Sequence, residues 1–391
     1  MKNLWSDEES KSFTSDLELR VYTSNLLGRS DELVLHGGGN TSVKTEVDGE
    51  DILYVKGSGW DLVSIKAEGF APVKLDTLLE MAKLKTLSDT DMVSGQKAAM
   101  IDKTAPNPSV EAILHAIIPF KFVDHTHADA VVSISNSVTG VENIKKLFPN
   151  FLIIPYVMPG FILAQTIYKK SKDLDWSKCE GIILHNHGIF TFDDDAKRSY
   201  TKMIDAVTRA EEFLNENAQV TLKTPASKKK VDLKKLQSVI SKHKGYETLL
   251  HVNTSDLAYT YATQDDLAHA ACRGVLTPEH IIRTKRIPLV LEDGNFEAAI
   301  KKYEDDYMEY FNDFANGEIC LNPAPNYAVI KDFGVVSFGK SEKEASIIND
   351  IIEHTMLAVL RADMLEGYKS INISDSFAME YWELEQVKLR K

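Results

Sequence analysis

The spacing of apolar residues in the first part of the chain predicts alternating helices and strands. Helical periodicity predicts an amphipathic helix over residues 7–27. Two strands should follow at residues 33–47 and 51–59, because the Asp48-Gly49 pair between them is a hairpin turn signal. Helices are expected at residues 73–86, from Ser109, at 161–171 and from about Asp195 to Asn217. A buried strand is expected at 122–135 and an apolar strand pair at 181–192.

A change of composition divides the chain into two parts. The segment LKTPASKKKVDLKK (222–235) is polar, rich in lysine and contains a proline. Such a segment is typical of a linker, and its lysines would form a solvated connector. We therefore expect a domain at residues 1–222, a linker at 223–235 and a C-terminal α/β domain at 236–391.

The second part contains a partial copy of the first. In both segments an apolar strand, a glycine, a strand ending in phenylalanine and a long helix follow one another. Lys331 and Phe333 stand in the second copy where the first has His185 and His187. The likeness indicates either a duplicated unit whose second copy lost these histidines or two unrelated segments of similar layout. The two segments are residues 181–214 and 328–360.

Composition and charge exclude several classes of function. The 391 residues include 43% apolar and 26% charged residues, and the formal charge is −13. So acidic a chain is not expected to bind nucleic acid, and it has no apolar run long enough for a membrane helix. The three cysteines are isolated, and the N-terminus lacks the apolar stretch of a signal peptide. We expect a cytoplasmic protein with reduced thiols.

A glycine-rich stretch, LVLHGGGNTSVK (33–44), requires a special backbone. Two uses compete for it: the oxyanion hole of a lipase-like serine hydrolase, or a loop that binds a phosphate or another anion. The hydrolase would need the nucleophile motif GxSxG, which the sequence does not contain. The stretch is therefore interpreted as an anion-binding loop.

Two histidine pairs indicate a metal site. His125 and His127 are two residues apart, a spacing that places both side chains on one face of a strand. His185 and His187 repeat this spacing. Imidazole nitrogens bind Zn²⁺ well, although they also accept other transition metals.

A carboxylate precedes the first histidine pair. Glu111 falls in the first turn of the helix expected from Ser109. There it could stabilise the helix N-terminus, or it could act as a general acid or base beside a metal. Helix geometry alone favours the stabilising role.

Five short motifs occur in an order that resembles the class II, zinc-dependent aldolase/adducin-like family. This family includes fuculose- and rhamnulose-1-phosphate aldolases and ribulose-5-phosphate 4-epimerase. The resemblance covers residues 1–220 and implies an α/β fold: a central, mostly antiparallel sheet flanked by helices in three α/β/α layers, followed by the smaller C-terminal α/β domain. The motifs are GNTS (39–42), KGSG (56–59), PSVE (108–111), HTH (125–127) and NHG (186–188).

Two further stretches resemble a narrower group. RGVLTPEHIIRTKRIPLVL (273–291) and FAMEYWELEQVKL (377–389) are similar to the aldolase halves of bifunctional rhamnulose-1-phosphate aldolase/short-chain dehydrogenase proteins. The sequence contains no dinucleotide-binding GxGxxG motif. The resemblance therefore implies the lyase half without NAD, for which a separate dehydrogenase could be a partner.

The family resemblance implies roles for individual residues. His125, His127 and His187 would hold a divalent metal, most simply Zn²⁺, with His185 as a neighbour, and Glu111 would be the catalytic acid/base. The residues implied for substrate and phosphate binding are Gly39, Asn40, Ser58, Gly59 and Ser109.

One position departs from the family pattern. Val110 stands where fuculose-phosphate-type aldolases have a second serine, so one hydroxyl of the phosphate pocket is missing. Lys56 could compensate for it electrostatically. So could basic residues of the C-terminal domain if it folds over the site: Arg273, Arg283, Lys285 and Arg286.

The activity that the resemblance implies is cleavage of a ketose 1-phosphate, rhamnulose-1-phosphate-like, into dihydroxyacetone phosphate and a hydroxyaldehyde. Family members are commonly oligomers, so a homodimer or homotetramer is expected. Two alternatives remain open: an epimerase or another metal-dependent lyase acting on a different sugar or sugar acid, with or without a phosphate, and a non-catalytic scaffold as in the adducin branch.

Overall fold

The chain divides into two compact units. The computed structural model describes residues 1–225 and 229–389. One unit comprises Met1–Ser135 and Val141–Leu214, and the other comprises Asn136–Gly140 and Asn215–Lys391. Helix α10 begins at Leu233 and so takes up the last residues of the predicted linker.

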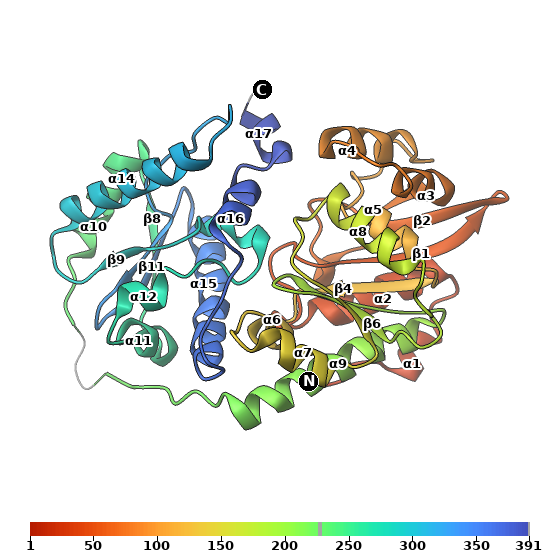
Figure 1. The fold of residues 1–391 in the computed structure, drawn as a ribbon, viewed down its shortest axis with the longest axis horizontal. Helices are drawn as coiled ribbons and strands as arrows, with labels where there is room; N and C mark the ends of the chain where they lie inside the picture. The colour runs from red at the N-terminus through yellow and green to blue at the C-terminus, as the bar shows by residue number, and fades with distance from the viewer. Residues whose placement is uncertain (226–228, 390–391) are drawn as a thin grey trace. The chain divides into compact units, whose positions relative to one another are not determined.

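The first unit contains strands β1–β7 and helices α1–α9 (Figure 1). Its strands are β1 (Asn40–Val47), β2 (Glu50–Lys56), β3 (Phe70–Lys74), β4 (Phe122–Thr126), β5 (Phe151–Ile154), β6 (Gly181–Leu184) and β7 (Gly188–Asp193). Its helices are α1 (Asp7–Ser10), α2 (Asp16–Gly28), α3 (Leu75–Ala82), α4 (Asp89–Ala98), α5 (Ala112–Ile117), α6 (Asp129–Ser135), α7 (Gly140–Leu147), α8 (Phe161–Ser171) and α9 (Ala196–Asn217), with 3₁₀ turns at Leu62–Ser64 and Ala67–Gly69.

The seven strands form one sheet in the order β3-β2-β1-β4-β7-β6-β5. Neighbouring strands are antiparallel except for β5 and β6, which are parallel. Figure 1 shows α3, α5 and α8 on one side of these strands and α2 and α9 on the other. This arrangement confirms the expected three-layer fold with a mostly antiparallel sheet.

Strand β4 shows how the sequence separates the two faces, because alternate side chains point to opposite sides. Asp124 forms a buried ion pair with Arg20 of α2, and the Thr126 hydroxyl donates to the Met203 sulfur of α9, 3.2 Å away. Val123 packs instead into the apolar core with residues of α3, α5 and α8. His125 alternates with Asp124 and therefore lies on this second face.

The predicted N-terminal helix is in fact two helices. The helix expected over residues 7–27 is interrupted between α1 and α2. The second begins at a capping box, in which Ser15 accepts from the Glu18 backbone and the Glu18 side chain accepts from the Ser15 backbone. This local start signal outweighs the continuous apolar periodicity.

Three of the strand predictions were too long, and the one over residues 51–59 ends at Lys56. The strand expected over residues 122–135 ends at Thr126, and the helix α6 follows, which is buried after its first residue, Asp129. The strand expected from residue 33 begins only at Asn40, because Gly37 and Gly39 have φ angles of +82° and +63° that a strand does not allow.

The second unit is built on a four-stranded sheet in the order β8-β11-β10-β9. Its strands are β8 (Leu249–Asn253), β9 (Leu289–Leu291), β10 (Tyr327–Ile330) and β11 (Gly334–Gly339). Its helices are α10 (Leu233–Lys244), α11 (Asp256–Ala262), α12 (Leu267–Ala271), α13 (Ile281–Thr284), α14 (Phe296–Phe314), α15 (Glu342–Asp363), α16 (Ile373–Glu380) and α17 (Glu383–Leu389), with a 3₁₀ turn at Pro278–His280.

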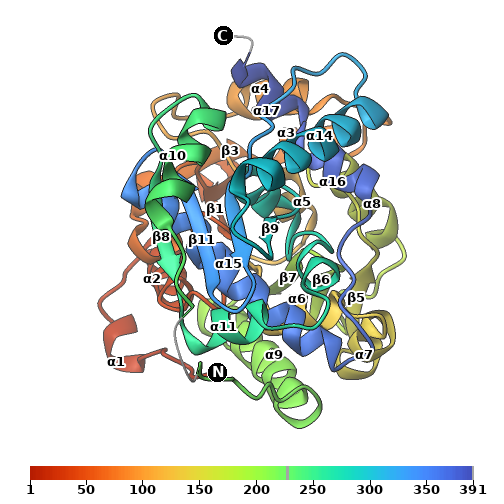
Figure 2. The ribbon, with the colours of Figure 1, turned by 90° about the vertical axis from the view of Figure 1, so that its left-hand side faces the viewer.

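This smaller sheet repeats half of the larger one. Strands β8-β11-β10-β9 have the same order and directions as β4-β7-β6-β5: two antiparallel pairs followed by a parallel pair. Helices α11 and α15 contact β11, while α10, α14 and α16 contribute to the core on the other face, which Figure 2 turns toward the viewer. The shared topology supports duplication rather than a chance likeness.

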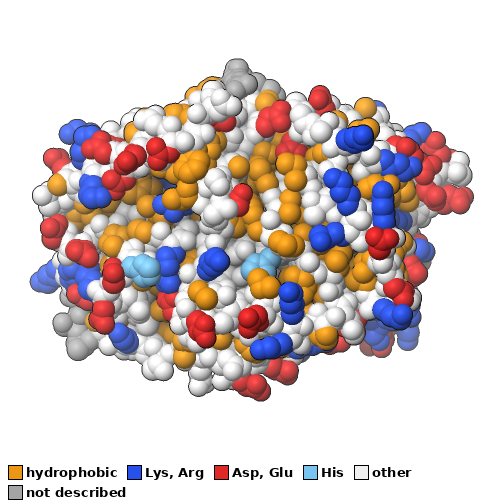
Figure 3. Space-filling view, in the orientation of Figure 1, with side chains coloured by type: hydrophobic (Ala, Val, Ile, Leu, Met, Phe, Trp, Pro, Cys, Tyr) orange, Lys and Arg blue, Asp and Glu red, His pale blue; other side chains and the backbone are white. Residues whose placement is uncertain are grey.

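The surface carries both signs of charge. Acidic and basic side chains are interspersed on the face drawn in Figure 3, although the whole chain has a formal charge of −13. Within residues 1–225 and 229–389, none of the helices combines the length and the apolar character needed to cross a membrane.

Candidate active site

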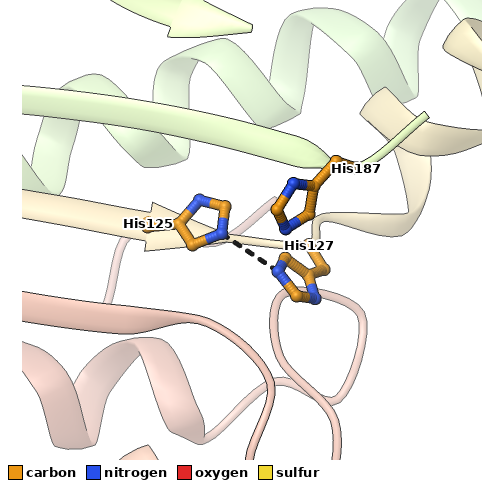
Figure 4. Close-up of side chains that lie close together, drawn as sticks. All are labelled: His125, His127 and His187. Atoms are coloured by element: carbon orange, nitrogen blue, oxygen red, sulfur yellow. Dashed lines mark hydrogen bonds between the residues drawn. The ribbon is translucent and has the colours of Figure 1, made fainter. Parts of the chain in front are cut away.

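Three histidines meet where β4 and the β6–β7 turn come together (Figure 4). His125 lies on β4, His127 directly follows this strand, and His187 precedes β7. One ring nitrogen of each lies within 4.8 Å of those of the other two, and in the described part of the chain this is the group suited to hold a metal ion. His127 reaches the group from beyond the strand end rather than from the strand face.

The His125 ring is fixed in an orientation suited to a metal ligand. It stacks on Phe190, with 4.0 Å between ring centroids, and its Nδ1 lies 3.1 Å from the Ile189 carbonyl oxygen. A carbonyl only accepts, so Nδ1 carries the proton and Nε2 presents its lone pair. Nε2 is 3.0 Å from the His127 Nε2. Two imidazole nitrogens bound to one Zn²⁺ would lie about 3.3 Å apart, so the pair fits a shared ion.

Glycines allow the segments around the histidines to approach closely. A Cβ on Gly188 would lie 2.4 Å from the Thr126 carbonyl oxygen. A Cβ on Gly39 would lie 2.7 Å from the His125 carbonyl oxygen. The glycine loop therefore packs against the end of β4 that carries the histidines.

Glu111 points toward the histidines rather than toward its own helix. It is the N-cap residue of α5, but its side chain makes no capping hydrogen bond. Its Oε2 is 3.5 Å from the His125 Nε2, and its Oε1 is 3.9 Å from the His187 Nε2. The carboxylate thus borders the position that a metal held by the histidines would occupy.

Asn40 is hydrogen-bonded to the Glu111 carboxylate, and His115 is hydrogen-bonded to Asn40. The Asn40 Nδ2 donates to the Glu111 Oε2 at 2.7 Å, and the Asn40 Oδ1 is hydrogen-bonded to the His115 Nε2. The His115 Nδ1 lies 2.7 Å from the Ser42 Oγ. Burial lowers the pKa of His115 well below its usual range, and the nearby His125, Lys44 and Arg20 act in the same direction.

His115 was not among the site residues expected from the sequence. A signal was present, because residues four apart lie on the same face of a helix and His115 is four residues after Glu111. Asn40 was assigned to the anion pocket, and its amide is in fact bonded to Glu111 and His115.

The residues expected to bind an anion lie on adjoining segments. Ser109 donates its backbone N–H to the Lys56 carbonyl at 3.1 Å, and the Lys56 Nζ donates to the Gly37 carbonyl at 3.1 Å. Ser58 and Gly59 follow at the exposed end of β2. Burial lowers the pKa of Lys56 to about 8, although Asp61 and Glu111 raise it in part.

The other candidate side chains are engaged locally. The His185 Nδ1 lies 2.8 Å from the Asn186 Oδ1. In the second unit, the Lys285 Nζ donates to the Asn322 carbonyl at 2.6 Å and lies over the Tyr307 ring, and Arg273 pairs with Asp363. The remaining basic candidates have contacts in the same unit: the Arg283 carbonyl accepts from Asn326, and Arg286 lies over Tyr310.

The fold is that of a class II aldolase domain, and comparison with known proteins agrees. Residues 18–214 match the class II aldolase and adducin N-terminal domain, and residues 227–389 match the class II aldolase second domain. The chain belongs to the class II aldolase and adducin family.

Two relatives are particularly similar. The N-terminal class II aldolase domain of a conserved protein from Thermoplasma acidophilum is 41% identical, with a TM-score of 0.50 over 55% of this chain and 99% of that chain. An uncharacterized oxidoreductase of Bacillus subtilis (strain 168), YuxG, is 29% identical over 100% of this chain. The chain spans 60% of the length of that relative.

A third similarity is weaker. The L-fuculose-1-phosphate aldolase of Thermus thermophilus is 14% identical, with a TM-score of 0.34 over 51% of this chain and 95% of that chain.

Proposed function

We propose that the protein is a metal-dependent aldehyde-lyase that cleaves a ketose 1-phosphate, rhamnulose-1-phosphate-like, into dihydroxyacetone phosphate and a hydroxyaldehyde. One observation carries this proposal: a carboxylate, Glu111, borders three histidines whose nitrogens converge. An acid/base group beside a metal site is what cleavage of a carbon–carbon bond next to a carbonyl requires.

The three histidines fit a divalent metal. The donor set is all imidazole, and the Ile189 carbonyl fixes the His125 tautomer that presents Nε2. Three imidazoles suit Zn²⁺ and leave one coordination position open, as in catalytic zinc sites. When bound there, a divalent cation acts as a Lewis acid that stabilises negative charge developing on a substrate oxygen.

Glu111 would move the proton. When the carbon–carbon bond breaks, the hydroxyl on the carbon that becomes the aldehyde gives up its proton to solvent and a carbonyl forms there. The electron pair of the broken bond stays on the fragment that becomes dihydroxyacetone phosphate, and its carbon must take up a proton. Glu111 Oε2 is held by Asn40, whereas Oε1 is buried without a hydrogen-bond partner among the described residues. Oε1 is therefore the oxygen we assign to proton exchange with that carbon.

The segments around the glycine loop would hold the phosphate. Lys56 supplies a buried positive charge, and Ser58, Gly59 and Ser109 supply hydroxyl and backbone groups close to it. A phosphate bound at a distance from the reacting carbons would hold those carbons beside Glu111. This favours the reaction, because less entropy is then lost on reaching the transition state. This arrangement supports a phosphorylated substrate.

The alternative is an epimerase or another metal-dependent lyase that acts on an unphosphorylated sugar or sugar acid. Val110 favours it, since a valine cannot supply the hydroxyl that a second serine would add to the phosphate pocket. A non-catalytic scaffold is less well supported, because the histidines and the carboxylate are all present and close together.

A screen for reverse aldol cleavage tests the proposal. Ketose 1-phosphates and the same ketoses without phosphate would be incubated with the purified protein and Zn²⁺, and the released dihydroxyacetone phosphate or dihydroxyacetone would be measured. We expect cleavage of a 1-phosphate that stops when the metal is chelated. Turnover of unphosphorylated sugars alone would support the alternative, and no cleavage of any ketose would contradict the lyase proposal.

A further inference from the structure

We propose that His115 is a positioning residue that sets the orientation of the Asn40 amide, and through it the orientation of the Glu111 carboxylate. The inference rests on the proposed role of Glu111 for its effect on catalysis. Its structural part, the direction of each hydrogen bond in the chain Ser42–His115–Asn40–Glu111, does not depend on the substrate.

The donors and acceptors allow only one direction for each hydrogen bond in this series of four side chains. An ionised carboxylate can only accept, so the amide nitrogen of Asn40, not its oxygen, must face the Glu111 Oε2 at 2.7 Å. The Asn40 Oδ1 then faces His115, and since it too can only accept, the His115 Nε2 must carry a proton. A neutral imidazole has one N–H, so Nδ1 accepts from the Ser42 hydroxyl at 2.7 Å.

The surroundings keep His115 neutral and in place. The residue is fully buried, and its ring meets Phe190 edge-on with centroids 5.5 Å apart. Burial lowers its pKa well below the usual range, so the ring remains uncharged near neutral pH. The Lys44 Nζ also donates to the His115 carbonyl at 2.8 Å, which ties the end of α5 to β1.

The fold explains why this series of hydrogen bonds can be rigid. Asn40 and Ser42 are two residues apart on β1 and therefore face the same side of the sheet. Glu111 and His115 are four residues apart at the start and middle of α5 and therefore face the same side of the helix. A strand and a helix thus present two partners each, and the hydrogen bonds alternate between them.

Without the His115 Nε2 proton, the Asn40 Oδ1 loses this donor, and the amide is held in the chain only at its Glu111 end. A flipped amide would place its oxygen against the Glu111 carboxylate, which is repulsive. Glu111 would then lose both a donor and its fixed orientation beside the histidines. The metal site itself would remain, because His115 is not one of its residues.

The hydrogen-bond directions can be tested without any substrate. In the full-length protein labelled with ¹⁵N-histidine, the His115 signals would be assigned by comparison with His115→Gln. We expect at pH 7 a neutral ring protonated on Nε2 and not on Nδ1. A ring protonated on Nδ1 or on both nitrogens would overturn the proposal. If His115→Gln does not fold, Ser42→Ala supports the assignment by shifting the Nδ1 signal.

The positioning role is tested by two substitutions of similar size. In His115→Gln the side-chain NH₂ can replace the Nε2 donor, whereas His115→Phe has no donor. We expect His115→Phe to lower kcat about 10- to 100-fold with KM within about 3-fold, and His115→Gln to keep most of the activity. Both variants should bind the same amount of Zn²⁺ as the wild type.

Equal losses of kcat in both variants, an unchanged His115→Phe enzyme or a rise in KM alone would contradict the positioning role. If the protein cleaves no ketose 1-phosphate, the proposed function fails while the ¹⁵N result still decides the hydrogen-bond directions. The two failures are therefore distinguishable.

Discussion

At the scale of single residues, the two oxygens of Glu111 have different surroundings. Oε2 accepts from Asn40, and Oε1 is buried without a hydrogen-bond partner in the described part of the chain. A buried carboxylate oxygen without a donor is unfavourable for stability, and such groups occur where a ligand completes the site. This asymmetry is the reason for assigning proton exchange to Oε1 of Glu111.

Lys56 gives a prediction about pH. If an anion binds beside Lys56, sulfate should raise the melting temperature by about 2–4 °C at pH 7, where the lysine is charged. The pKa of Lys56 is lowered to about 8, so this protection should fall as the pH rises through that value. Sulfate suits the measurement because it does not change its own charge in this range.

Two variants of Lys56 distinguish the effect of its charge from that of other cationic side chains. Lys56→Arg stays charged and should keep its sulfate protection at pH 9.5, whereas Lys56→Met should have none at either pH. Without an anion, the effect of pH on stability has the opposite direction. Because the folded-state pKa lies below the unfolded value of 10.5, the free energy of unfolding should rise between about pH 8 and pH 10.5. Equal sulfate protection of the wild type at pH 7 and pH 9.5 would contradict the role of Lys56.

The sequence predicted some of the site residues directly and others not at all. His125 and His127 could be identified because two histidines in an apolar segment have few structural uses. The partners of Glu111 could not, because the hydrogen bonds of Asn40 depend on how β1 and α5 pack, which is a tertiary property. For the same reason, sequence alone favoured a helix-stabilising role for Glu111, although its side chain makes no capping hydrogen bond.

At the scale of elements, the glycine loop gives a second prediction. Gly39→Ala should lower the free energy of unfolding by more than about 2 kcal/mol, because the residue has a φ of +63° and its Cβ would lie 2.7 Å from the His125 carbonyl. It should also reduce metal content, since the clash falls on the strand end that carries the histidines. Urea unfolding and metal analysis would measure the two effects.

Two other glycines serve as controls for Gly39. Gly49 has a φ of +81° with open space around a Cβ, so Gly49→Ala should cost only about 1 kcal/mol and leave the metal content unchanged. Gly188 would bring a Cβ to 2.4 Å from the Thr126 carbonyl, so Gly188→Ala should resemble Gly39→Ala. If Gly39→Ala behaved like Gly49→Ala, the close packing of the loop on β4 would be wrong.

Most elements could be predicted from the sequence, and the errors have a common physical cause. The helix at residues 161–171 and the turn at Asp48-Gly49 were correct because their periodicity and turn residues are local. Residues 129–135 were predicted as strand but form the helix α6, in which Ala130–Ser135 are buried. A short segment buried on all sides has no amphipathic period, so its sequence does not distinguish helix from strand.

At the scale of the whole molecule, duplication explains why one chain should have one metal site. Val252 pairs with Val336, which lies two residues after Gly334. In the same way, His125 pairs with Phe190, which lies two residues after Gly188. By the same correspondence, the second sheet has an apolar or hydroxyl side chain at each position that carries a metal histidine in the first. These are Val252, Thr254 and Phe333.

The number of bound metal ions tests this conclusion. We expect one equivalent of Zn²⁺ per full-length chain by elemental analysis and less than about 0.1 equivalent in His125→Ala, because the loss of one of three ligands removes most of the affinity. His185→Ala is the control and should retain the full equivalent. A second equivalent in the wild type, or metal retained in His125→Ala, would show a site other than the three histidines.

The central claim is that Glu111 exchanges a proton with the carbon next to the substrate carbonyl. It is tested most directly by NMR of dihydroxyacetone phosphate in ²H₂O with the Zn²⁺-loaded protein, which requires no knowledge of the aldehyde. We predict that the wild type replaces one hydrogen of the hydroxymethyl carbon by deuterium and that Glu111→Gln, with unchanged metal content, does so at least about 100-fold more slowly. Exchange at the wild-type rate in Glu111→Gln, or none in the wild type, would contradict the claim.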